Sequence, residues 1–162
     1  MKSNNKQNQN FWYDIMSEII PKKLYLGNIV NVNRLQWMNQ NNINTIICVA
    51  NKDDITIKKE IMDVKRVYQF EIKDNMNQTL DFDTIIQLIE ESFSQGAVLV
   101  NCAAGMSRSP SFVIAYLMKM QQKSFNDAFI FVKRARPKIF PNSFFMTQLQ
   151  TYEDKLRLSK DM

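Results

Sequence analysis

The chain has 162 residues, 45% of them hydrophobic, which is enough for one domain with a sizeable core. Its two cysteines and complete lack of histidine argue against a structural zinc site and a disulfide framework, and exclude mechanisms in which imidazole activates a nucleophile. No apolar run approaches the roughly 18 residues of a membrane span, and the N-terminus carries no secretory signal, so we expect a cytoplasmic and/or nuclear protein.

The first half of the chain is predicted to hold three strands. Residues 1–10 are rich in Asn, Gln and Lys and are expected to form a disordered tail. Residues 11–20 are predicted to form an aromatic-led turn or short helix. Apolar runs predict the strands, which lie at residues 23–28, 45–50 and 67–72, with a short helix at 33–41 and a charged connection of unassigned structure at 53–66.

The second half is predicted to be mainly helical, with one short buried strand. The strand lies at residues 97–100, and helices are predicted at 82–94, from Pro110 for about three turns, at 125–135 and at 141–158. Asp81 and Asp83 are placed to cap the first helix or to favour its dipole, and Ser124 caps the third. We assign residues 11–158 to one domain, with a short C-terminal tail at 159–162.

Strands that alternate with helices, five or so in number with the four assigned above, predict an α/β fold. We expect a central, mostly parallel five-stranded sheet that is flanked by helices. Ligand-binding loops of such folds lie at the carboxyl ends of the strands, so we look for the functional site at that edge.

Residues 98–116 hold the one arrangement that calls for a chemical explanation. A buried strand runs into Cys102, a tight loop follows, and Arg108 stands where a helix begins. A loop wrapped onto a helix N-terminus points backbone N–H groups inward and suits a tetrahedral dianion. Gly105 permits the backbone conformation that such a loop needs, and the planar fork of Arg108 holds two phosphate oxygens. The same field favours a thiolate at Cys102, so the loop predicts attack on a bound phosphoryl group.

The loop sequence resembles the Cys-x5-Arg-Ser/Thr phosphate-binding loop of cysteine-based protein phosphatases. It reads Cys102-Ala103-Ala104-Gly105-Met106-Ser107-Arg108-Ser109. Its context is most similar to the small, atypical dual-specificity branch of the protein tyrosine phosphatase superfamily. The strand Leu24-Tyr25-Leu26-Gly27 and the Arg-x4-Pro-Asn junction at residues 136–142 are similar to the same family. The similarity covers about residues 20–153 and implies a phosphotyrosine phosphatase-like fold with the phosphate-binding loop at the carboxyl edge.

The resemblance implies hydrolysis of phosphotyrosine and of phosphoserine or phosphothreonine through a phosphocysteine intermediate. Cys102 is then the nucleophile, Ser109 stabilises it as a leaving group, and Asp74 is the general acid. Asp81 stays the reserve candidate, since the loop before its helix is short. Phosphate oxygens are held by the loop amides and one guanidinium, from Ala103, Ala104, Gly105, Met106, Ser107 and Arg108. These groups supply the positive field, so no metal or other cofactor is expected.

One position departs from the family pattern. The family usually has histidine before the catalytic cysteine, and this chain has Asn101. Asparagine offers a donor and an acceptor and can replace part of the scaffold, as can Asn142 at the family junction, but it carries no positive charge. We therefore expect an active enzyme whose Cys102 ionises at higher pH than is usual in the family. The alternative is a catalytically weak pseudophosphatase that binds phosphoproteins.

The loop residues Ala103, Ala104 and Met106 are neutral, whereas phosphoinositide phosphatases of this superfamily tend to have basic residues there. A phosphoprotein, such as a signalling kinase, is therefore expected as substrate, with a phosphoinositide or RNA as the alternative. The net charge of +5 is spread along the chain, so no nucleic-acid or membrane partner is expected, and the chain should be a monomer or weak homodimer. Cys48 lies within an apolar run and is expected to be buried; a regulatory disulfide with Cys102, which occurs in some relatives, stays open.

Overall fold

The computed structural model describes residues 15–162, and the predicted tail at residues 1–10 lies outside this range. A five-stranded sheet of order β1-β2-β5-β3-β4 forms its centre. The strands are β1 (Ser17–Ile20), β2 (Leu24–Gly27), β3 (Ile43–Val49), β4 (Arg66–Phe70) and β5 (Ala97–Asn101). β1 pairs antiparallel with β2, whereas the pairs β2–β5, β5–β3 and β3–β4 are parallel. The predicted α/β class with a mostly parallel five-stranded sheet is confirmed.

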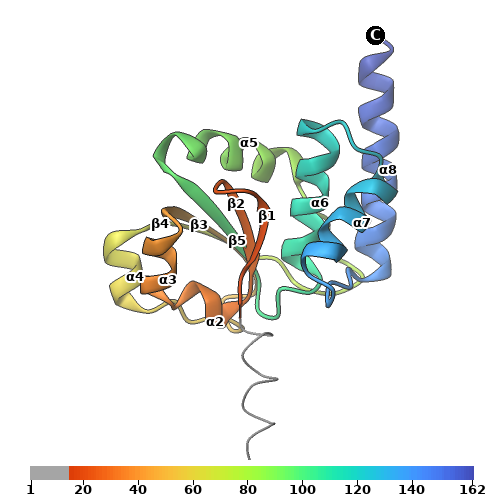
Figure 1. Ribbon diagram of the computed structural model, residues 1–162. Coiled ribbons are helices and arrows are strands. Elements are labelled where there is room, and N and C mark those ends of the chain that lie inside the picture. Colours follow the sequence, from red (N-terminus) through yellow and green to blue (C-terminus); the bar gives the residue numbers. More distant parts are fainter. Residues whose placement is uncertain (1–14) are drawn as a thin grey trace, which may run out of the picture.

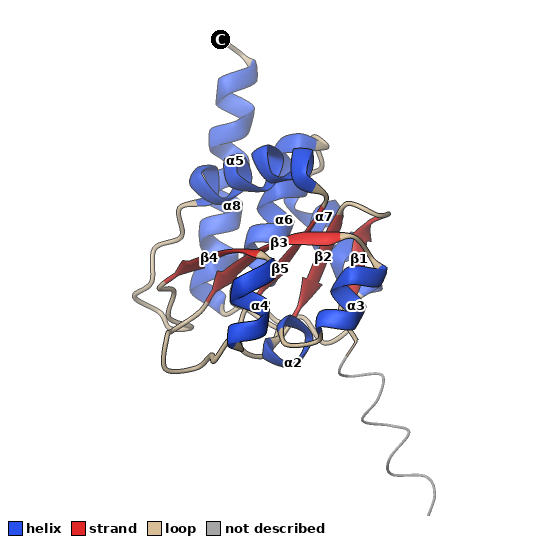
Figure 2. Cartoon of the chain, turned by 90° about the vertical axis from the view of Figure 1, so that its left-hand side faces the viewer, coloured by secondary structure: helices blue, strands red, loops and turns tan. Residues whose placement is uncertain are grey.

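Helices cover both faces of this sheet (Figures 1 and 2). One face carries the four longer helices, which are α5 (Phe82–Ser92), α6 (Arg108–Met120), α7 (Phe125–Ala135) and α8 (Ser143–Lys160). The other face carries the short helices α2 (Ile29–Val32), α3 (Leu35–Gln40) and α4 (Lys59–Val64). A single 3-10 turn, η1 (Phe93–Gln95), links α5 to β5. No helix within residues 15–162 has both the length and the hydrophobicity to cross a membrane.

The central strand β5 explains where the functional loop must lie. All five of its residues are buried, and they contribute alternately to the two cores: Val98 and Val100 pack towards α5–α8, and Ala97 and Leu99 towards α2–α4. Asn101 ends the strand beside Gly27 of β2 and Cys48 of β3. The carboxyl ends of three parallel strands therefore meet where the Cys102 loop begins.

Two predictions about local structure need correction. Within residues 11–20, the predicted turn or short helix is wrong from Ser17 onward, because this segment is strand β1; residues 11–14 lie outside the described range. Ser17 pairs with Leu26, so hydrogen bonds to a neighbouring strand outweigh the local apolar pattern. The connection at residues 53–66, left unassigned, contains the short helix α4. The predicted caps at Ser124 and Asp81 are confirmed, since Ser124 Oγ accepts from Asp127 N and Asp81 Oδ1 accepts from Thr84 N. Asn142 caps α8 in the same way by accepting from Phe145 N.

Asp83 ties three helices together on the face covered by α5–α8. Its carboxylate lies 2.8 Å from Lys119 Nζ of α6 and 2.8 Å from Lys155 Nζ of α8, and it accepts a hydrogen bond from Tyr152 of α8. The hydrogen bonds from both lysines hold the pKa of the Asp83 carboxyl well below its usual range. Ionised Asp83 is therefore favoured by the folded state.

The Asp83→Asn variant should be less stable than the wild type at pH 7. Because the Asp83 side chain is 42% exposed, solvent screening limits the expected loss to about 1 kcal/mol. A depressed carboxyl pKa contributes stability above the unfolded value of about 4 and loses it as the pH falls. The difference in unfolding free energy between the wild type and Asp83→Asn, measured in urea, should therefore become smaller as the pH falls from 5 to 2. Asp63→Asn, which breaks only the exposed pair with Lys59, is the control and should cost less; equal losses for both variants would contradict the role of Asp83.

Candidate active site

The loop at residues 102–107 links β5 to α6, and its carbonyl groups are held outward. The Ala103 carbonyl accepts from Ile29 N at 3.1 Å, and the Met106 carbonyl accepts from Phe140 N at 2.6 Å. The Gly105 carbonyl accepts from Arg136 Nε at 2.8 Å. These three carbonyl oxygens accept hydrogen bonds from surrounding segments, whereas Gly105 N donates to Cys102 Sγ within the loop. Successive inward N–H groups form an anion-binding concavity.

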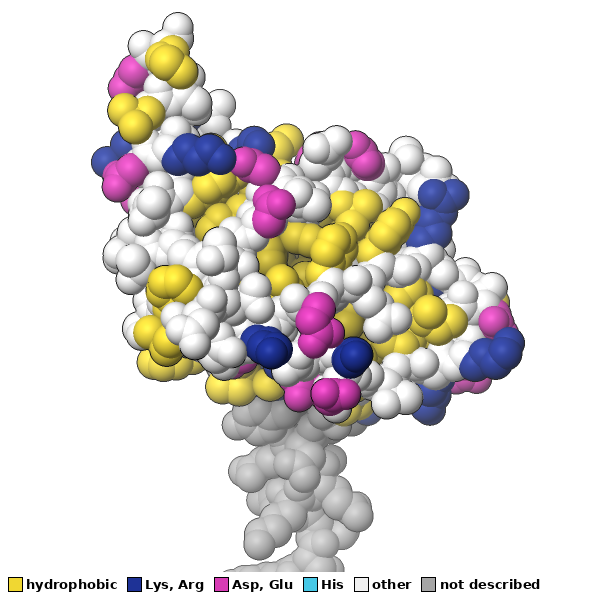
Figure 3. All heavy atoms as spheres, turned by 180° about the vertical axis from the view of Figure 1, so that it is seen from behind, with side chains coloured by type: hydrophobic (Ala, Val, Ile, Leu, Met, Phe, Trp, Pro, Cys, Tyr) yellow, Lys and Arg dark blue, Asp and Glu magenta, His cyan; other side chains and the backbone are white. Residues whose placement is uncertain are grey.

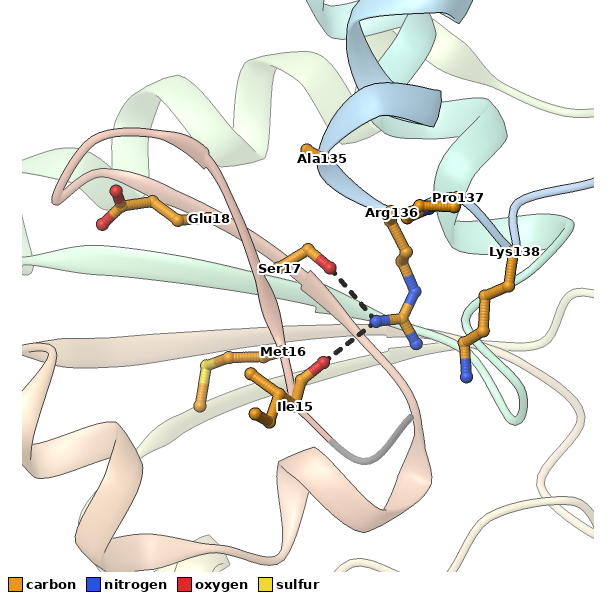
Figure 4. A pocket seen from close by; sticks show the side chains of 8 residues that line it. All are labelled: Ile15, Met16, Ser17, Glu18, Ala135, Arg136, Pro137 and Lys138. Atoms are coloured by element: carbon orange, nitrogen blue, oxygen red, sulfur yellow. Dashed lines mark hydrogen bonds between the residues drawn. The ribbon is translucent and has the colours of Figure 1, made fainter. Parts of the chain in front are cut away.

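Arg136 supports the loop from behind. Its side chain is buried, and its Nη1 donates to Ile15 O and to Ser17 Oγ at 3.1 and 3.2 Å (Figure 4). Burial lowers the pKa of Arg136, while the nearby Cys102 acts in the opposite sense. The Arg136 guanidinium thus connects the start of the edge strand β1 to Gly105 of the loop and holds the loop in place.

Gly105 occupies a position that no other residue fills without strain. Its φ is +65°, and a Cβ there would lie 2.6 Å from Arg136 Nη2 and 2.7 Å from Gly27 O. The left-handed conformation and the contact with backbone both exclude a side chain. The prediction that Gly105 permits a closely wrapped loop is consistent with this geometry.

We expect Gly105→Ala to lower both stability and turnover. Strain and the collision with Gly27 should cost about 2 kcal/mol of unfolding free energy and displace the loop N–H groups. Gly96→Ala is a matched control, because Gly96 has a φ of +128° and a Cβ there would lie 2.8 Å from Asn42 O, away from the loop. Gly96→Ala should lose stability while keeping its turnover per folded molecule. Equal turnover for the two variants would contradict a specific role of Gly105.

The sulfur of Cys102 lies at the floor of the loop and accepts two hydrogen bonds. Gly105 N lies 3.2 Å from it and Ser109 Oγ 3.1 Å. Both groups donate to a sulfur that carries negative charge more readily than to a neutral thiol. The structure therefore brings the predicted nucleophile together with the predicted serine that stabilises it.

Arg108 opens α6 and reaches across the loop. Its side chain is 8% exposed, and Nη1 donates to Asp54 Oδ2 at 2.9 Å and to Ile72 O at 3.0 Å. Nε is buried and has no hydrogen-bond partner within residues 15–162. A buried guanidinium N–H without a partner is costly, so it marks the place where an anion would complete the site.

Asp74 lies in the segment between β4 and α5 and is held at the loop by two donors. Ser107 Oγ and Asn142 Nδ2 lie 2.8 and 2.9 Å from Asp74 Oδ1. Asn142 N also donates to Ser107 Oγ at 3.0 Å. The residue that precedes α8 and the loop therefore hold the Asp74 carboxyl group together. Two donors on Oδ1 leave Oδ2 as the oxygen that can carry a proton. Asp81, the reserve candidate, instead caps α5 through Thr84 N and Thr84 Oγ1.

Asn101 and Cys48 face each other on neighbouring strands beneath the loop. Asn101 Nδ2 donates to Cys48 Sγ at 3.9 Å, whereas its Oδ1 is buried without a hydrogen-bond partner in the described part of the chain. Burial raises the pKa of the Cys48 thiol to about 12, and both cysteines are free. The amide of Asn101 therefore bonds to β3 through Cys48.

Comparison with known proteins agrees with this geometry. A family model described as "Dual specificity phosphatase, catalytic domain" matches residues 24–155. This chain belongs to the dual-specificity phosphatase family. It is 41% identical over 145 residues to the dual specificity protein phosphatase Mpk3 of Drosophila melanogaster, covering 87% of the chain and 34% of that protein. It is 33% identical over 149 residues to the MAP kinase phosphatase with leucine-rich repeats protein 2 of Dictyostelium discoideum, covering 90% of the chain and 21% of that protein.

The chain thus spans about a third or less of the length of these relatives of the dual-specificity phosphatase family. A solved structure, the human tyrosine phosphatase-like serine/threonine/tyrosine-interacting protein, superposes with a TM-score of 0.80 at 33% identity. The alignment covers 86% of this chain and 96% of that one. The resemblance drawn from the loop sequence is confirmed at the level of family and fold.

Two residues of this dual-specificity phosphatase domain escaped sequence reasoning. Asp54 pairs with Arg108 from a connection that the sequence left unassigned, and Arg136 was noticed only as part of the family junction. For Asp54 the available signal was its place, a carboxylate a few residues past the end of a buried strand, as for Asp74. That signal did not distinguish it from its neighbour Asp53.

Proposed function

We propose that this domain is a metal-independent, cysteine-dependent phosphatase that hydrolyses phosphotyrosine and phosphoserine or phosphothreonine in proteins. One observation supports this most strongly. The Cys102 sulfur accepts hydrogen bonds from the Gly105 N–H and the Ser109 hydroxyl, and the same loop ends at Arg108, whose buried Nε has no partner within the described residues. These are the groups that a phosphoryl transfer to sulfur needs.

In the first step, the Cys102 sulfur attacks phosphorus in line while the loop N–H groups and Arg108 hold the three equatorial oxygens. The sulfur–phosphorus bond forms as the bond to the substrate oxygen breaks. Asp74, protonated on Oδ2, gives its proton to that oxygen, because the unprotonated alkoxide or phenolate leaves poorly. Ser107 and Asn142 keep the carboxyl group aimed during this transfer.

In the second step, water hydrolyses the phosphocysteine. Asp74, now ionised, takes a proton from the water while the water oxygen attacks phosphorus. The sulfur–phosphorus bond breaks and the electron pair returns to Cys102 Sγ. The Ser109 hydroxyl, already 3.1 Å from this sulfur, stabilises the departing thiolate. Inorganic phosphate leaves and the site returns to its starting state.

Exposed apolar residues around the loop favour a protein substrate. Phe140 is 73% exposed, and its backbone bonds to Met106, which is also exposed. The exposed Met76 approaches Ser143 at the start of α8. The apolar side chains of a peptide can pack against such residues beside the phosphorylated side chain. The face seen in Figure 3 carries Lys, Arg, Asp and Glu side chains in alternation, with no field of one sign that would attract a polyanion.

Phosphate release from four substrate classes tests the proposal. Purified protein is supplied with a phosphotyrosine peptide, a phosphothreonine peptide, a soluble phosphoinositide and a 5′-triphosphorylated RNA. We expect turnover of both peptides and at least about tenfold lower kcat/KM for the other two. Preferential turnover of the phosphoinositide or the RNA would overturn the substrate class while leaving the reaction intact.

The alternative, a phosphoprotein-binding module without turnover, has two features in its favour. One structural relative is described as a phosphatase-like interacting protein, and Asn101 gives its amide to Cys48. Against it, Cys102, Arg108, Asp74 and Ser109 are all present and in hydrogen-bonded order around one loop. The relatives Mpk3 of Drosophila melanogaster and MAP kinase phosphatase with leucine-rich repeats protein 2 of Dictyostelium discoideum are both described as phosphatases. Hydrolysis is therefore the favoured function.

We further infer a signalling kinase as the substrate and a monomer or weak homodimer as the working form, in the cytoplasm or nucleus. Two relatives from Dictyostelium discoideum are MAP kinase phosphatases by name, which supports a kinase as the substrate. Exposed large apolar residues that are scattered over several elements support the monomer. Substrate trapping in cell extract, followed by identification of the retained phosphoprotein, tests the first inference.

A further inference from the structure

Asp54 approaches the loop from a separate part of the chain, and its position is fixed on both sides. It ends the turn that follows β3, where Asp54 N donates to Asn51 O at 3.0 Å. The next residue, Ile55, is buried in the core beneath α5–α8. The backbone that carries Asp54 is therefore held on both sides, while its side chain is 40% exposed.

The contact between Asp54 and Arg108 uses one particular nitrogen. Nη1 carries two hydrogens, one of which goes to Asp54 Oδ2 at 2.9 Å and the other to Ile72 O at 3.0 Å. The remaining N–H groups of the guanidinium are on Nε and Nη2, which lie side by side on the opposite edge. This edge is one of the two that grip paired oxygens of a phosphate, and its Nε is the buried atom without a partner.

We propose that Asp54 is a positioning residue for Arg108, which it holds by Nη1 so that the Nε–Nη2 edge faces the phosphate. The inference rests on the proposed phosphatase function. A free arginine side chain samples many rotamers, and binding phosphate would have to select one of them. With Nη1 held by Asp54 and Ile72, this selection is made before the substrate arrives. Ile72 lies two residues before Asp74, so the same guanidinium also connects to the general-acid segment.

Asp54→Ala, Asp54→Glu and Asp53→Asn separate orientation from charge. Asp53 is an exposed neighbour, so its amide removes one negative charge near the site without touching Arg108. We expect Asp54→Ala to raise both KM and the inhibition constant of inorganic phosphate about tenfold, and Asp54→Glu to restore them to within about threefold. Asp53→Asn should stay within about twofold of the wild type. Thermal unfolding of each variant shows whether the fold is kept.

A second experiment, in a protein that already lacks the Arg108 side chain, tests the role of Asp54 without measuring turnover. Phosphate affinity is measured by calorimetry for Arg108→Ala and for Arg108→Ala with Asp54→Ala. If Asp54 acts through Arg108, its loss should change phosphate affinity less than about twofold in this background. Tighter phosphate binding by Asp54→Ala in the wild-type background would show that the carboxylate repels the anion, and unchanged binding would show that it is idle; both overturn the inference. A wild type that binds phosphate but does not hydrolyse peptides would instead refute the proposed function alone.

Discussion

Cys102→Ser is expected to reduce phosphate release from a phosphotyrosine peptide by at least about four orders of magnitude. A serine hydroxyl stays protonated at neutral pH, so the loop field cannot convert it into a strong nucleophile. Gly105 N and Ser109 Oγ can still bond to the smaller oxygen, and Arg108 is unaffected. Phosphopeptide affinity, measured by calorimetry, should therefore stay within about tenfold of the wild type while turnover is lost.

Cys48→Ala is the control for the second cysteine of the chain. Cys48 is buried on β3, so its truncation should cost about 1 kcal/mol of stability without changing turnover per folded molecule. Rapid quench of the wild type with a radiolabelled phosphopeptide should capture phosphate bound to the protein, and Cys102→Ser should capture none. Turnover of Cys102→Ser equal to that of the wild type would refute the thiol mechanism and leave phosphopeptide binding as the function.

Asp74→Asn should lower kcat for a phosphotyrosine peptide by about 100-fold or more. An amide can keep the hydrogen bonds from Ser107 and Asn142 through its oxygen but has no acidic proton to give. The loss should depend on the leaving group, because tyrosine phenolate, with an ordinary pKa of about 10, needs protonation far more than nitrophenolate does. With p-nitrophenyl phosphate we therefore expect a loss of about tenfold or less.

Asp81→Asn distinguishes the two aspartates between which the sequence could not decide. Asp81 caps α5, so its amide should leave kcat for both substrates within about twofold of the wild type. Because asparagine caps a helix about as well as aspartate, the unfolding free energy of Asp81→Asn should stay within about 0.5 kcal/mol of the wild type. If Asp81→Asn rather than Asp74→Asn produced the loss that depends on the leaving group, the assignment of the general acid would be reversed.

Several parts of the fold were predictable because their causes are local. The all-apolar run of β5 predicts burial on both faces, and parallel strands that alternate with helices follow from it. Ser124 and Asn142 start helices because their side chains cap the N–H groups three residues on. β1 was missed because its four residues carry no alternating pattern of their own and owe their form to antiparallel pairing with β2, which follows after residues 21–23.

The sequence by itself determined the chemistry of the loop, since Cys102, Gly105, Arg108 and Ser109 lie within one turn and the start of the following helix. Only the tertiary structure decided which distant groups complete the site. It brings Asp74 from the segment after β4, Asp54 from the turn after β3 and Arg136 from the end of α7. Such contacts join residues 31 or more positions apart, because strands far apart in the sequence end side by side at the same edge of the sheet. Spacing along the chain decides which residues lie in the same loop, whereas the order of the strands in the sheet decides which loops lie next to one another.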